Sequence, residues 1–572
     1  MKVLVFAKQI PDVNSIGFDP STNRIIRENV PLQMNSFDRK AVEEALRIKE
    51  KYGWETAVAT MGPPPSAEII NLSLMMGIDR GFLLTDRSFG GSDTLVTARI
   101  LSSFVSYYKP DLVLMGKYSL DGETSQVPPE LAKLCNFSFK SSISKLEIVG
   151  DVCTAEQDAE RSIVTYELKL PAVISVSEKI NRARAVKQGT PDMNGKVEIV
   201  DSKKLGIRIS GVAESPTVVA GTERIESKRR VAFLGSGEKV YETALRIIKT
   251  RYAGDIEKVA VTEDGGRGIA LGIAVSDSIV SMEIASNNFQ LAQAEGLSTV
   301  IIGNIVPAEL RRMPANRYVF LKESESRCIA EFIAEYIRKN RPKFVLYPST
   351  VDGREIAAFV AAELGLGLTA DCVDLRIENG KLIQYKPAFG GGIIARIYSK
   401  TDPQMATVRP GMLRRLESVS EFTVEEPDMV LCNSNVKRIS VVEVPPQFKP
   451  LNQSRVIVAV GKGIRKPDNI KDAIQLADRL DASIGATRPI VDFGWIPRQQ
   501  QIGLTGISIS PDVYIAIGIS GNDNHVVGTR YAKKIIAVNN DPNAPIFQYA
   551  DYGIIADSME FIKGFLEYLQ TH

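Results

Sequence analysis

Several short segments near the C-terminus combine glycines with side chains that can hold a phosphate or an aromatic ring. Gly461-Lys462-Gly463 follows a strand-like run, where glycines let the backbone approach a phosphate and the lysine adds positive charge. The segment 518–525 follows a second apolar run and offers backbone N–H groups and a serine hydroxyl to a pyrophosphate. Taken singly, each segment is also compatible with a plain strand-to-helix turn or, for Arg488, with a surface salt bridge. The candidate nucleotide-binding residues of this region are Gly461, Lys462, Gly463, Thr487, Arg488, Gln501, Gly503, Thr505, Gly506, Gly518, Ser520, Gly521, Asn524, His525, Asn540, Asp541 and Asp551.

The residue counts argue against most other chemistries. The 70 basic and 68 acidic side chains nearly cancel, which leaves no global field to hold nucleic acid. The five cysteines form no C-x-x-C pair, so zinc and iron–sulfur ligand sets are missing and reduced thiols are expected. The only two histidines, His525 and His572, do not supply haem ligation or most hydrolase triads. Any chemistry must therefore come from a bound cofactor.

The N-terminus and the hydropathy predict a cytoplasmic protein. Residues 1–7 form an apolar run that enters a polar turn at once, which indicates a first strand and not a signal peptide. No apolar run approaches the roughly 18 to 20 residues of a membrane span. We therefore expect a cytoplasmic location and no membrane-spanning helix.

The apolar patterning predicts an α/β fold with parallel sheets covered by helices. Short β-branched runs alternate with amphipathic stretches at 2–8, 39–52, 56–60, 66–76, 81–84, 94–108 and 111–115. A further α/β unit opens at 455–460, and its later strands are expected at 513–517 and 534–538.

An internal repeat divides the chain. The run 109–115 recurs at 341–347, and an Asp-Gly pair follows each copy, at Asp121-Gly122 and Asp352-Gly353. Two copies of this size indicate duplicated domains and not a solenoid. We expect three parallel-sheet nucleotide-binding-type domains, of which two are related by the repeat and the third is a doubly wound C-terminal domain. The expected boundaries are 1–205 with a C-terminal arm, 206–229 as a linker, 230–450 and 451–572.

The C-terminal segments together resemble the FAD domain of the electron-transfer flavoprotein alpha subunit, over nearly all of residues 452–572. Residues 367–411 resemble the N-terminal domain of the same subunit, and residues 1 to about 205 resemble the beta subunit. The resemblance implies a beta–alpha fusion in place of the usual heterodimer, an FAD cofactor, and electron transfer instead of substrate conversion. The strings that carry it are Gly485 to Arg488, Gln501 to Gly506, Gly518 to Gly521 with His525, Asn540 to Phe547, Ala550-Asp551, Met34 to Asp38, Ala41 to Ala45 and Gly116 to Val127.

The resemblance also implies roles for single residues. Arg488 would lie over the isoalloxazine ring and His525 would approach its N1 and O2 edge, so that positive charge favours a one-electron-reduced anionic flavin. Thr505 would hydrogen-bond near flavin N5. Ser520 and Gly521 would hold the pyrophosphate, with Asn540 and Asp551 near the adenosine half. The chain departs from the family pattern at Leu504, Thr487 and Asn522 to Asn524, where the family commonly has Gln, Ser and Ala-Ile-Gln.

A second nucleotide is implied in the N-terminal part. Ordinary members of the family bind AMP there, whereas the electron-bifurcating branch binds a second FAD. Leu120 to Pro129 and Asp86 to Thr94 resemble the bifurcating branch, and AMP remains the alternative. The candidate residues are Ala7, Lys8, Asn35, Asp38, Met61, Gly62, Gly116, Asp121, Gly122, Glu123, Thr124, Ser125, Gln126 and Val127.

The partners implied by the resemblance are a flavoprotein dehydrogenase or ferredoxin-type donor and a membrane-associated quinone oxidoreductase as acceptor. The arm 179–187 lacks the leucine and the Pro-Arg-Tyr run of the family's docking loop for acyl-CoA dehydrogenases, so a different donor is expected. Two alternatives stay open. Gly90 to Thr94 is loosely similar to the pyrophosphate loop of N-type ATP pyrophosphatases, which would make the chain an adenine-nucleotide enzyme, and a nucleotide sensor would explain the α/β domains alone.

Overall fold

The chain forms two units, which we call unit 1 and unit 2 and describe separately. Unit 1 comprises Met1–Glu223, Lys258–Phe389 and Ile394–Val444, and unit 2 comprises Arg224–Glu257, Gly390–Ile393 and Pro445–His572. The computed structural model describes residues 1–12, 17–19, 24–26, 30–159, 162–224, 229–235, 237–250, 257–262, 266–275, 277–388, 393–428, 432, 434–443, 447–503 and 506–572.

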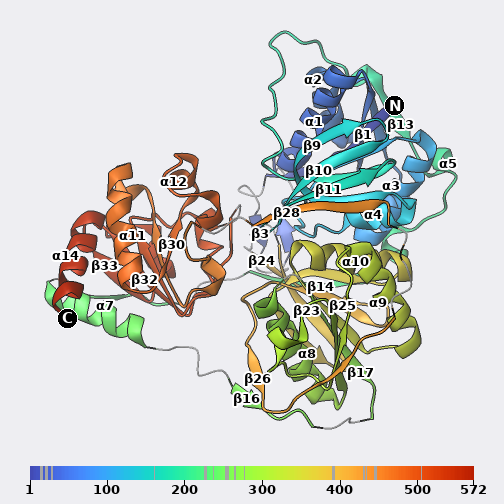
Figure 1. The fold of residues 1–572 in the computed structure, drawn as a ribbon. Coiled ribbons are helices and arrows are strands. Elements are labelled where there is room, and N and C mark those ends of the chain that lie inside the picture. The colour runs from blue at the N-terminus through green and yellow to red at the C-terminus, as the bar shows by residue number, and fades with distance from the viewer. Residues whose placement is uncertain are drawn as a thin grey trace. The chain divides into compact units, whose positions relative to one another are not determined.

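The first part of unit 1 is a ten-stranded sheet with the order β13-β7-β6-β1-β8-β12-β9-β10-β11-β28 (Figure 1). Leu4 and Phe6 enter one hydrophobic core with α3 and α4, while Val3 and Val5 enter another with α1 and α2. Both faces of the central strands are thus covered, as the continuous apolar runs predict. The central elements are β1 (Lys2–Phe6), α1 (Ser36–Tyr52), β6 (Glu55–Met61), α2 (Ala67–Met76), β7 (Arg80–Leu84), α3 (Thr94–Tyr108), β8 (Leu112–Gly116), α4 (Val127–Cys135) and β12 (Ala172–Val176).

The second sheet of unit 1 confirms the internal repeat. Its order β19-β18-β17-β20-β25 reproduces the order β7-β6-β1-β8-β12, strand for strand. Lys109 and Arg341, which precede β8 and β20 in the repeated run, both take the left-handed conformation, with φ of 55° and 46°. The elements are β17 (Ile269–Ala274), α8 (Ser278–Glu295), β18 (Ser298–Gly303), β19 (Arg317–Phe320), α9 (Ser326–Asn340), β20 (Phe344–Pro348), α10 (Val351–Leu364), β21 (Leu368–Cys372) and β25 (Gln404–Val408).

The two sheets of unit 1 share one hydrophobic core, to which α3, α4, α9 and α10 all contribute. Within it the rings of Phe139 and Phe359 meet edge to face, with centroids 5.8 Å apart. A buried ion pair lies beside this core: Lys140 Nζ is 2.9 Å from Glu355 Oε2, and both residues are 1% exposed. Glu355 Oε1 also accepts hydrogen bonds from the Ser141 amide and from Gln157 Nε2, each at 3.1 Å. The charges are therefore paired and hydrogen-bonded, which burial requires.

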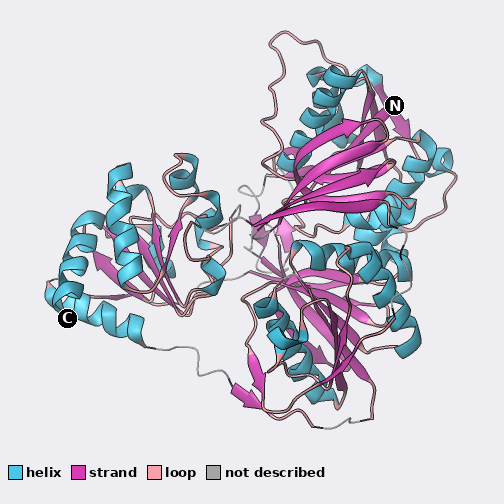
Figure 2. Cartoon of the chain, in the orientation of Figure 1, coloured by secondary structure: helices cyan, strands magenta, loops and turns pink. Residues whose placement is uncertain are grey.

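Unit 2 is a six-stranded parallel sheet with the order β15-β33-β32-β31-β29-β30. Figure 2 shows its strands as a central magenta sheet with helices beside it. This is the doubly wound C-terminal domain that the sequence predicts. Its elements are β15 (Ala232–Phe233), α7 (Glu238–Lys249), β29 (Val456–Val460), α11 (Ile470–Arg479), β30 (Ser483–Ala486), α12 (Arg488–Asp492), β31 (Val513–Ile517), α13 (Asp523–Val526), β32 (Lys534–Asn539), β33 (Tyr552–Ile555) and α14 (Ser558–Thr571).

The domain boundaries differ from those expected at 206–229 and 230–450. β15 pairs with β33, and Tyr241 of α7 stacks on Phe565 of α14 with centroids 5.6 Å apart, so this segment folds with unit 2. The expected linker contains β14 (Thr217–Arg224), a strand of a four-stranded sheet in the order β14-β24-β23-β22. β28 (Val436–Glu443) pairs with β11 in the N-terminal sheet, where Figure 1 shows it as an orange strand beside cyan ones.

The remaining described helices and strands complete these sheets or form smaller ones. They are β2 (Gln9–Pro11), β3 (Gly17–Asp19), β4 (Arg24–Ile26), β5 (Leu32–Met34), β9 (Ser138–Val149), β10 (Val152–Ala159), β11 (Ser162–Lys169), β13 (Val197–Val200), α5 (Ser202–Leu205), α6 (Gly211–Glu214), β16 (Glu257–Val259), β22 (Asp374–Glu378), β23 (Lys381–Ala388), β24 (Ile393–Ser399), β26 (Leu416–Ser418) and β27 (Thr423–Glu425). Among the described residues, no helix is long and apolar enough to cross a membrane.

The cysteines correct one expectation. Cys328 at the start of α9 and Cys432 form a disulfide, although the sequence predicts reduced thiols. The two residues are 104 positions apart, and no local spacing pattern announces the pair. Cys135, Cys153 and Cys372 are free, as expected.

Candidate functional site

The nucleotide-binding candidates of unit 2 gather at one edge of its sheet. Because all six strands are parallel, the segments that follow β29, β30, β31 and β32 leave the sheet at the same carboxyl edge. The segment around Gln501 joins this edge through a bridge between Gln501 and Ala486, the last residue of β30. The carboxyl edge of a doubly wound sheet is where such folds bind nucleotides.

The glycines after β29 serve a different purpose from the predicted one. The amides of Gly461 and Gly463 donate to Ile517 and Gly518 carbonyls at 2.9 and 3.0 Å, so they are not free for a phosphate. A Cβ on Gly463 would lie 2.5 Å from Gly518 Cα, and one on Gly461 would lie 2.4 Å from Gly518 O. The glycines therefore permit two loops to pack on each other. Lys462 is exposed beside them.

Thr487 and Arg488 begin α12 at the end of β30. The Thr487 residue is 8% exposed, and its Oγ1 has no hydrogen-bond partner among the described residues. A buried hydroxyl without a partner is unfavourable unless a ligand supplies one. The Arg488 side chain is 66% exposed, and its Nε lies 3.3 Å from Asp492 Oδ2 one turn along the helix. The Arg488 guanidinium would therefore lie within reach of an anionic group bound at this edge, close to the Thr487 hydroxyl.

The segments after β31 and β32 interlock. The Ile546 amide donates to the Ser520 carbonyl at 3.0 Å, and a Cβ on Gly521 would lie 2.2 Å from the Ile546 nitrogen. Gly521 has φ of 90°, which only glycine adopts readily. The two segments thus form one rigid wall of the site. Among the candidate residues along this wall, Ser520, Asn524, Asn540 and Asp541 are exposed.

His525 differs most from its expected role. It is 6% exposed, its Nδ1 lies 3.1 Å from the Ile502 carbonyl, and its Nε2 lies 2.6 Å from the Tyr514 hydroxyl. Burial lowers the pKa of His525 to about 4, so the ring is neutral near pH 7. The expected positive charge on this histidine is therefore absent, and both ring nitrogens are engaged within unit 2.

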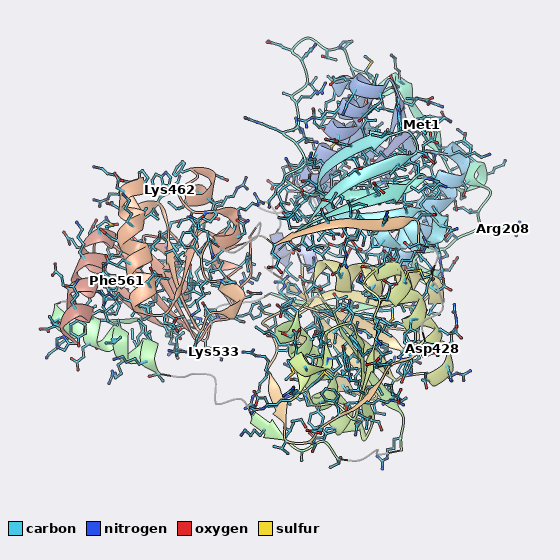
Figure 3. All side chains as sticks on the ribbon, viewed as in Figure 1. Met1, Arg208, Asp428, Lys462, Lys533 and Phe561 are labelled. Atoms are coloured by element: carbon cyan, nitrogen blue, oxygen red, sulfur yellow. A yellow bond between two sulfur atoms is a disulfide. The ribbon has the colours of Figure 1, made fainter. Side chains whose placement is uncertain are left out.

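Asp551 does not join the site. Asp551 precedes β33, its Oδ2 accepts from the Ile535 amide at 2.8 Å, and it forms an ion pair with Arg229. These contacts lie at the amino edge of the parallel sheet, opposite to the loops. Figure 3 shows the two edges far apart, with Lys462 marking one and Lys533 the other. Asp551 is thus part of a structural ion pair, and Thr505 lies outside the described residues.

Close contacts beside α13 involve Gln501, Gly503 and Gly506. The Ile507 amide donates to the Gln501 carbonyl at 2.7 Å, and a Cβ on Gly506 would lie 2.3 Å from the same oxygen. A Cβ on Gly503 would lie 2.5 Å from the Asn524 carbonyl, and its φ is 132°. Gly503 is therefore seated directly on the backbone of α13.

The N-terminal candidates in unit 1 also come together. Lys8 follows β1, and its Nζ lies 2.7 Å from Asp121 Oδ2 in the loop after β8. Asp38 is buried at the start of α1, where its two carboxylate oxygens accept the Lys8 amide at 2.8 Å and the Gly116 amide at 2.9 Å. Burial raises the pKa of Asp38 to about 6. Asn35, fully buried, donates from Nδ2 to the Tyr118 carbonyl at 2.9 Å.

The loop 117–126 carries unusual backbone. Glu123 and Ser125 have φ of 49° and 57°, in the left-handed region that non-glycine residues rarely occupy. Gln126 fixes the end of the loop, because its Nε2 donates to the Leu368 carbonyl at 3.0 Å. Such conformations concentrate at functional sites when the surrounding structure enforces them. Ala7, Met61, Gly62, Gly122, Thr124 and Val127 lie on the same ends of β1, β6 and β8 or in this loop.

The family comparisons agree with this arrangement. The model of the electron transfer flavoprotein domain matches residues 22–205 and 280–429, which is more than half of the chain. The chain belongs to the electron transfer flavoprotein family. The model of the electron transfer flavoprotein FAD-binding domain matches residues 450–530, the region of the carboxyl-edge loops. The two family models of electron transfer flavoproteins thus match regions in both units.

Relatives of both subunit types are similar to this chain. The electron transfer flavoprotein subunit alpha of Thermoanaerobacterium thermosaccharolyticum is 39% identical over 42% of this chain and 74% of its own length. The subunit beta of the same organism is 33% identical over 44% of this chain and 99% of its own length. A lactate dehydrogenase (NAD(+),ferredoxin) subunit LctC of Acetobacterium woodii is 36% identical over 42% of this chain and 59% of its own length. One electron transfer flavoprotein chain therefore combines regions similar to beta and alpha subunits.

The sequence reasoning did not select Tyr514. It is the one polar side chain in β31, which otherwise consists of Val513, Ile515, Ala516 and Ile517, and it is fully buried. A buried tyrosine hydroxyl usually has a hydrogen-bond partner. A tyrosine within an aliphatic central strand is the signal that could have pointed to it.

Proposed function

We propose that this electron transfer flavoprotein holds one FAD against the carboxyl edge of the unit 2 sheet and a second nucleotide at the carboxyl edge of the first sheet of unit 1. The observation that carries the first assignment is the partnerless, buried Thr487 hydroxyl within the segment that matches the FAD-binding domain. It fits the group, because a bound nucleotide would supply the missing partner. FAD, when bound, would supply the redox chemistry of electron transfer.

The chain's own residues would bind and orient the cofactor. The interlocked segments 518–525 and 540–547 give a preformed wall, and Ser520 and Asn540 are exposed on it for phosphate and ribose contacts. Arg488 would place positive charge beside the ring system, since it is exposed at the start of α12. A cation near a flavin favours its reduced, more negative form, so Arg488 would raise the reduction potential.

The second nucleotide is proposed as FAD, with AMP as the alternative. Lys8, Asp121 and the strained residues Glu123 and Ser125 support a site built for a ligand at the loop after β8. The similarity to the LctC subunit favours a branch of the family linked to ferredoxin, as that relative's name states for that protein. A flavoprotein dehydrogenase or ferredoxin-type donor and a quinone oxidoreductase acceptor are the partners we propose.

Nucleotide extraction from the purified full chain tests both assignments. We expect two FAD molecules per chain, or one FAD and one AMP if the alternative holds. A Thr487→Val variant should lose a large part of one FAD equivalent, while Thr529→Val, a buried threonine whose hydroxyl already bonds the Val526 carbonyl, serves as the control. A folded chain that retains no FAD would overturn the proposal.

Arg488→Ala tests the electrostatic role. We expect the variant to bind FAD with a lower reduction potential, because a cation close to the ring is removed. Arg479→Ala at the end of α11, equally a surface arginine of unit 2, is the control and should leave the potential unchanged. Equal potentials for the chain and the Arg488 variant would remove this role from Arg488.

A further inference from the structure

His525 has a defined protonation pattern that follows from its two partners. The Ile502 carbonyl can only accept a hydrogen bond, so Nδ1 at 3.1 Å must carry a proton. The Tyr514 hydroxyl at 2.6 Å can either donate to Nε2 or accept from it. The state of the ring therefore depends on which of the two atoms in that bond is the donor.

The surroundings of Tyr514 decide the direction of this bond. Tyr514 is fully buried, and His525 is the sole hydrogen-bond partner of its hydroxyl in the described part of the chain. If Nε2 carried a proton, the tyrosine O–H would have no acceptor, and a buried imidazolium would face no hydrogen-bonded carboxylate among the described side chains. Both consequences are costly in a buried site. The hydroxyl consequently donates to Nε2.

His525 in turn holds Ile502 and Gly503. The Nδ1–H bond fixes the Ile502 carbonyl, and the neighbouring Gly503 packs against the Asn524 carbonyl and His525 Cα, where a Cβ would come within 2.5 and 3.1 Å. Tyr514, His525 and Ile502 thus form a chain of contacts from β31 through α13 to the segment at Ile502 and Gly503.

We propose that Tyr514 is a positioning residue that fixes His525 as the neutral Nδ1–H tautomer, and that His525 holds the segment at Ile502 and Gly503 and does not bring a positive charge to the flavin. This inference rests on the proposed function, because this segment borders a flavin only if FAD binds at this edge. In consequence, the cation beside the ring is to be sought at Arg488. The low pKa of His525, about 4, agrees with a neutral ring.

The histidine content makes the tautomer directly observable. The chain has two histidines, so a His572→Gln variant labelled with 15N-histidine gives signals from His525 alone. In the purified full chain we expect a protonated Nδ1 and an unprotonated, hydrogen-bonded Nε2 between pH 6 and pH 9. A protonated Nε2 near pH 7 would overturn the inference, whether or not FAD is bound.

Tyr514→Phe removes the hydroxyl and keeps the ring. We expect the Nε2 resonance to move to that of a nitrogen without a hydrogen bond, and the Kd of FAD to rise about 2- to 12-fold, as the loss of one hydrogen bond predicts. Tyr552→Phe at the other side of the sheet is the matched control and should change neither readout. An unchanged Nε2 resonance in Tyr514→Phe would overturn the inference.

A second pair of variants covers the case in which Tyr514→Phe does not fold. His525→Gln keeps an N–H for Ile502 and an acceptor for Tyr514, whereas His525→Leu keeps neither. FAD affinity should be retained better by the glutamine than by the leucine, and equal losses would contradict the positioning role. A neutral His525 in a folded chain that takes up no FAD would instead overturn the proposed function and leave the hydrogen-bond assignment standing.

Discussion

The two repeated halves of unit 1 share a strand order but differ at one connection. Between β8 and α4 the chain inserts ten residues, 117–126, whereas between β20 and α10 it inserts only Ser349 and Thr350. The Asp121-Gly122 pair lies in the long loop, and Asp352-Gly353 lies in the first turn of α10. A Cβ on Gly353 would lie 2.1 Å from the Pro348 carbonyl, so this glycine allows the tight turn itself. The same fold therefore carries a ten-residue loop in one copy and a two-residue connection in the other.

The glutamates near the starts of α4 and α10, the helices that follow these two connections, also differ in their partners. Glu355 of α10 is paired with Lys140 and receives further hydrogen bonds. Glu130 of α4 is equally buried, but it forms no ion pair among the described residues; its Oε1 accepts from the Thr94 hydroxyl at 3.1 Å, and its Oε2 has no partner there. Burial raises the pKa of Glu130 well above its usual range, which favours the neutral form of its carboxyl. One copy pairs its glutamate with a lysine of the other sheet, while the other copy leaves its glutamate without an ion pair at the start of the helix that follows loop 117–126.

The largest expected effect comes from breaking the pair in the second copy. Glu355→Leu would remove the nearer carboxylate from the buried Lys140 ammonium and leave only Glu325 Oε1 at 3.8 Å, which should lower the free energy of unfolding by about 3 to 5 kcal/mol. The chain has two tryptophans, Trp54 in unit 1 and Trp495 in unit 2. A Trp495→Phe background makes Trp54 fluorescence report on the urea unfolding of unit 1 alone.

The matching variant of the first copy is Glu130→Gln. Because burial favours the neutral form of the Glu130 carboxyl, an amide of the same shape should change the stability by less than about 1 kcal/mol. A loss as large as that of Glu355→Leu would mean that the two glutamates play the same role, and the contrast between the copies would then disappear.

Asp38 gives a pH dependence that belongs to the first copy. In the second copy, Asp277 caps α8 through the Ile279 and Val280 amides, whereas Asp38 reaches out of α1 to the Lys8 and Gly116 amides. Burial raises the Asp38 pKa from 3.8 to about 6, so the folded chain binds this proton more tightly than the unfolded chain. The resulting stability is present below pH 3.8 and is lost as the pH rises through 6, by about 3 kcal/mol in all.

The difference in unfolding free energy between the chain and Asp38→Asn measures this effect. Because asparagine does not titrate, the difference should fall by up to about 3 kcal/mol between pH 4 and pH 7. A difference that stays constant over this range would show that Asp38 is not the titrating group. The Trp54 signal again restricts the measurement to unit 1.

Gly116 sets how closely α1 approaches the end of β8. A Cβ at this position would lie 2.4 Å from Asp38 Oδ1 and 2.6 Å from Phe37 Cβ, so Gly116→Ala must displace the helix start. We expect a loss of about 1 to 3 kcal/mol and of the second nucleotide, measured by extraction. Gly195→Ala is the control, because no atom lies within 4 Å of its added Cβ, and full nucleotide retention in both variants would contradict the prediction.

The sequence predicts the topology better than the site. Continuous apolar runs such as β1 and β8 identify buried parallel strands directly, since no other element needs that pattern over five residues. β15 has only two residues, so the pairing that attaches this segment to unit 2 leaves no readable period. Long-range pairings of this kind are invisible in a local pattern, as is the disulfide between Cys328 and Cys432.

Residue roles are harder to predict, because the same residue type has different functions at different positions. A Gly-x-Gly turn is needed both where a backbone meets a phosphate and where Gly463 meets Gly518, and the spacing is the same. Asp551 follows a strand-rich segment as a nucleotide ligand would, but the direction of β33 places it at the opposite edge. The position of Thr487, Arg488 and Ser520 at the carboxyl edge of the sheet was predictable because each follows the end of a strand, whereas their role stays a prediction.

The smallest expected effect concerns Lys8 and Asp121, which attach the loop of the first copy to β1. The Lys8 side chain is 51% exposed, and solvent screens the 2.7 Å contact to Asp121. A double-mutant cycle with Lys8→Ala and Asp121→Ala should give a coupling of about 0.2 to 1 kcal/mol that disappears in 1 M salt. A salt-resistant coupling above about 2 kcal/mol would mean that the pair is desolvated. The ion pair would then hold the loop in place, and it would stabilise the left-handed backbone of Glu123 and Ser125 within that loop.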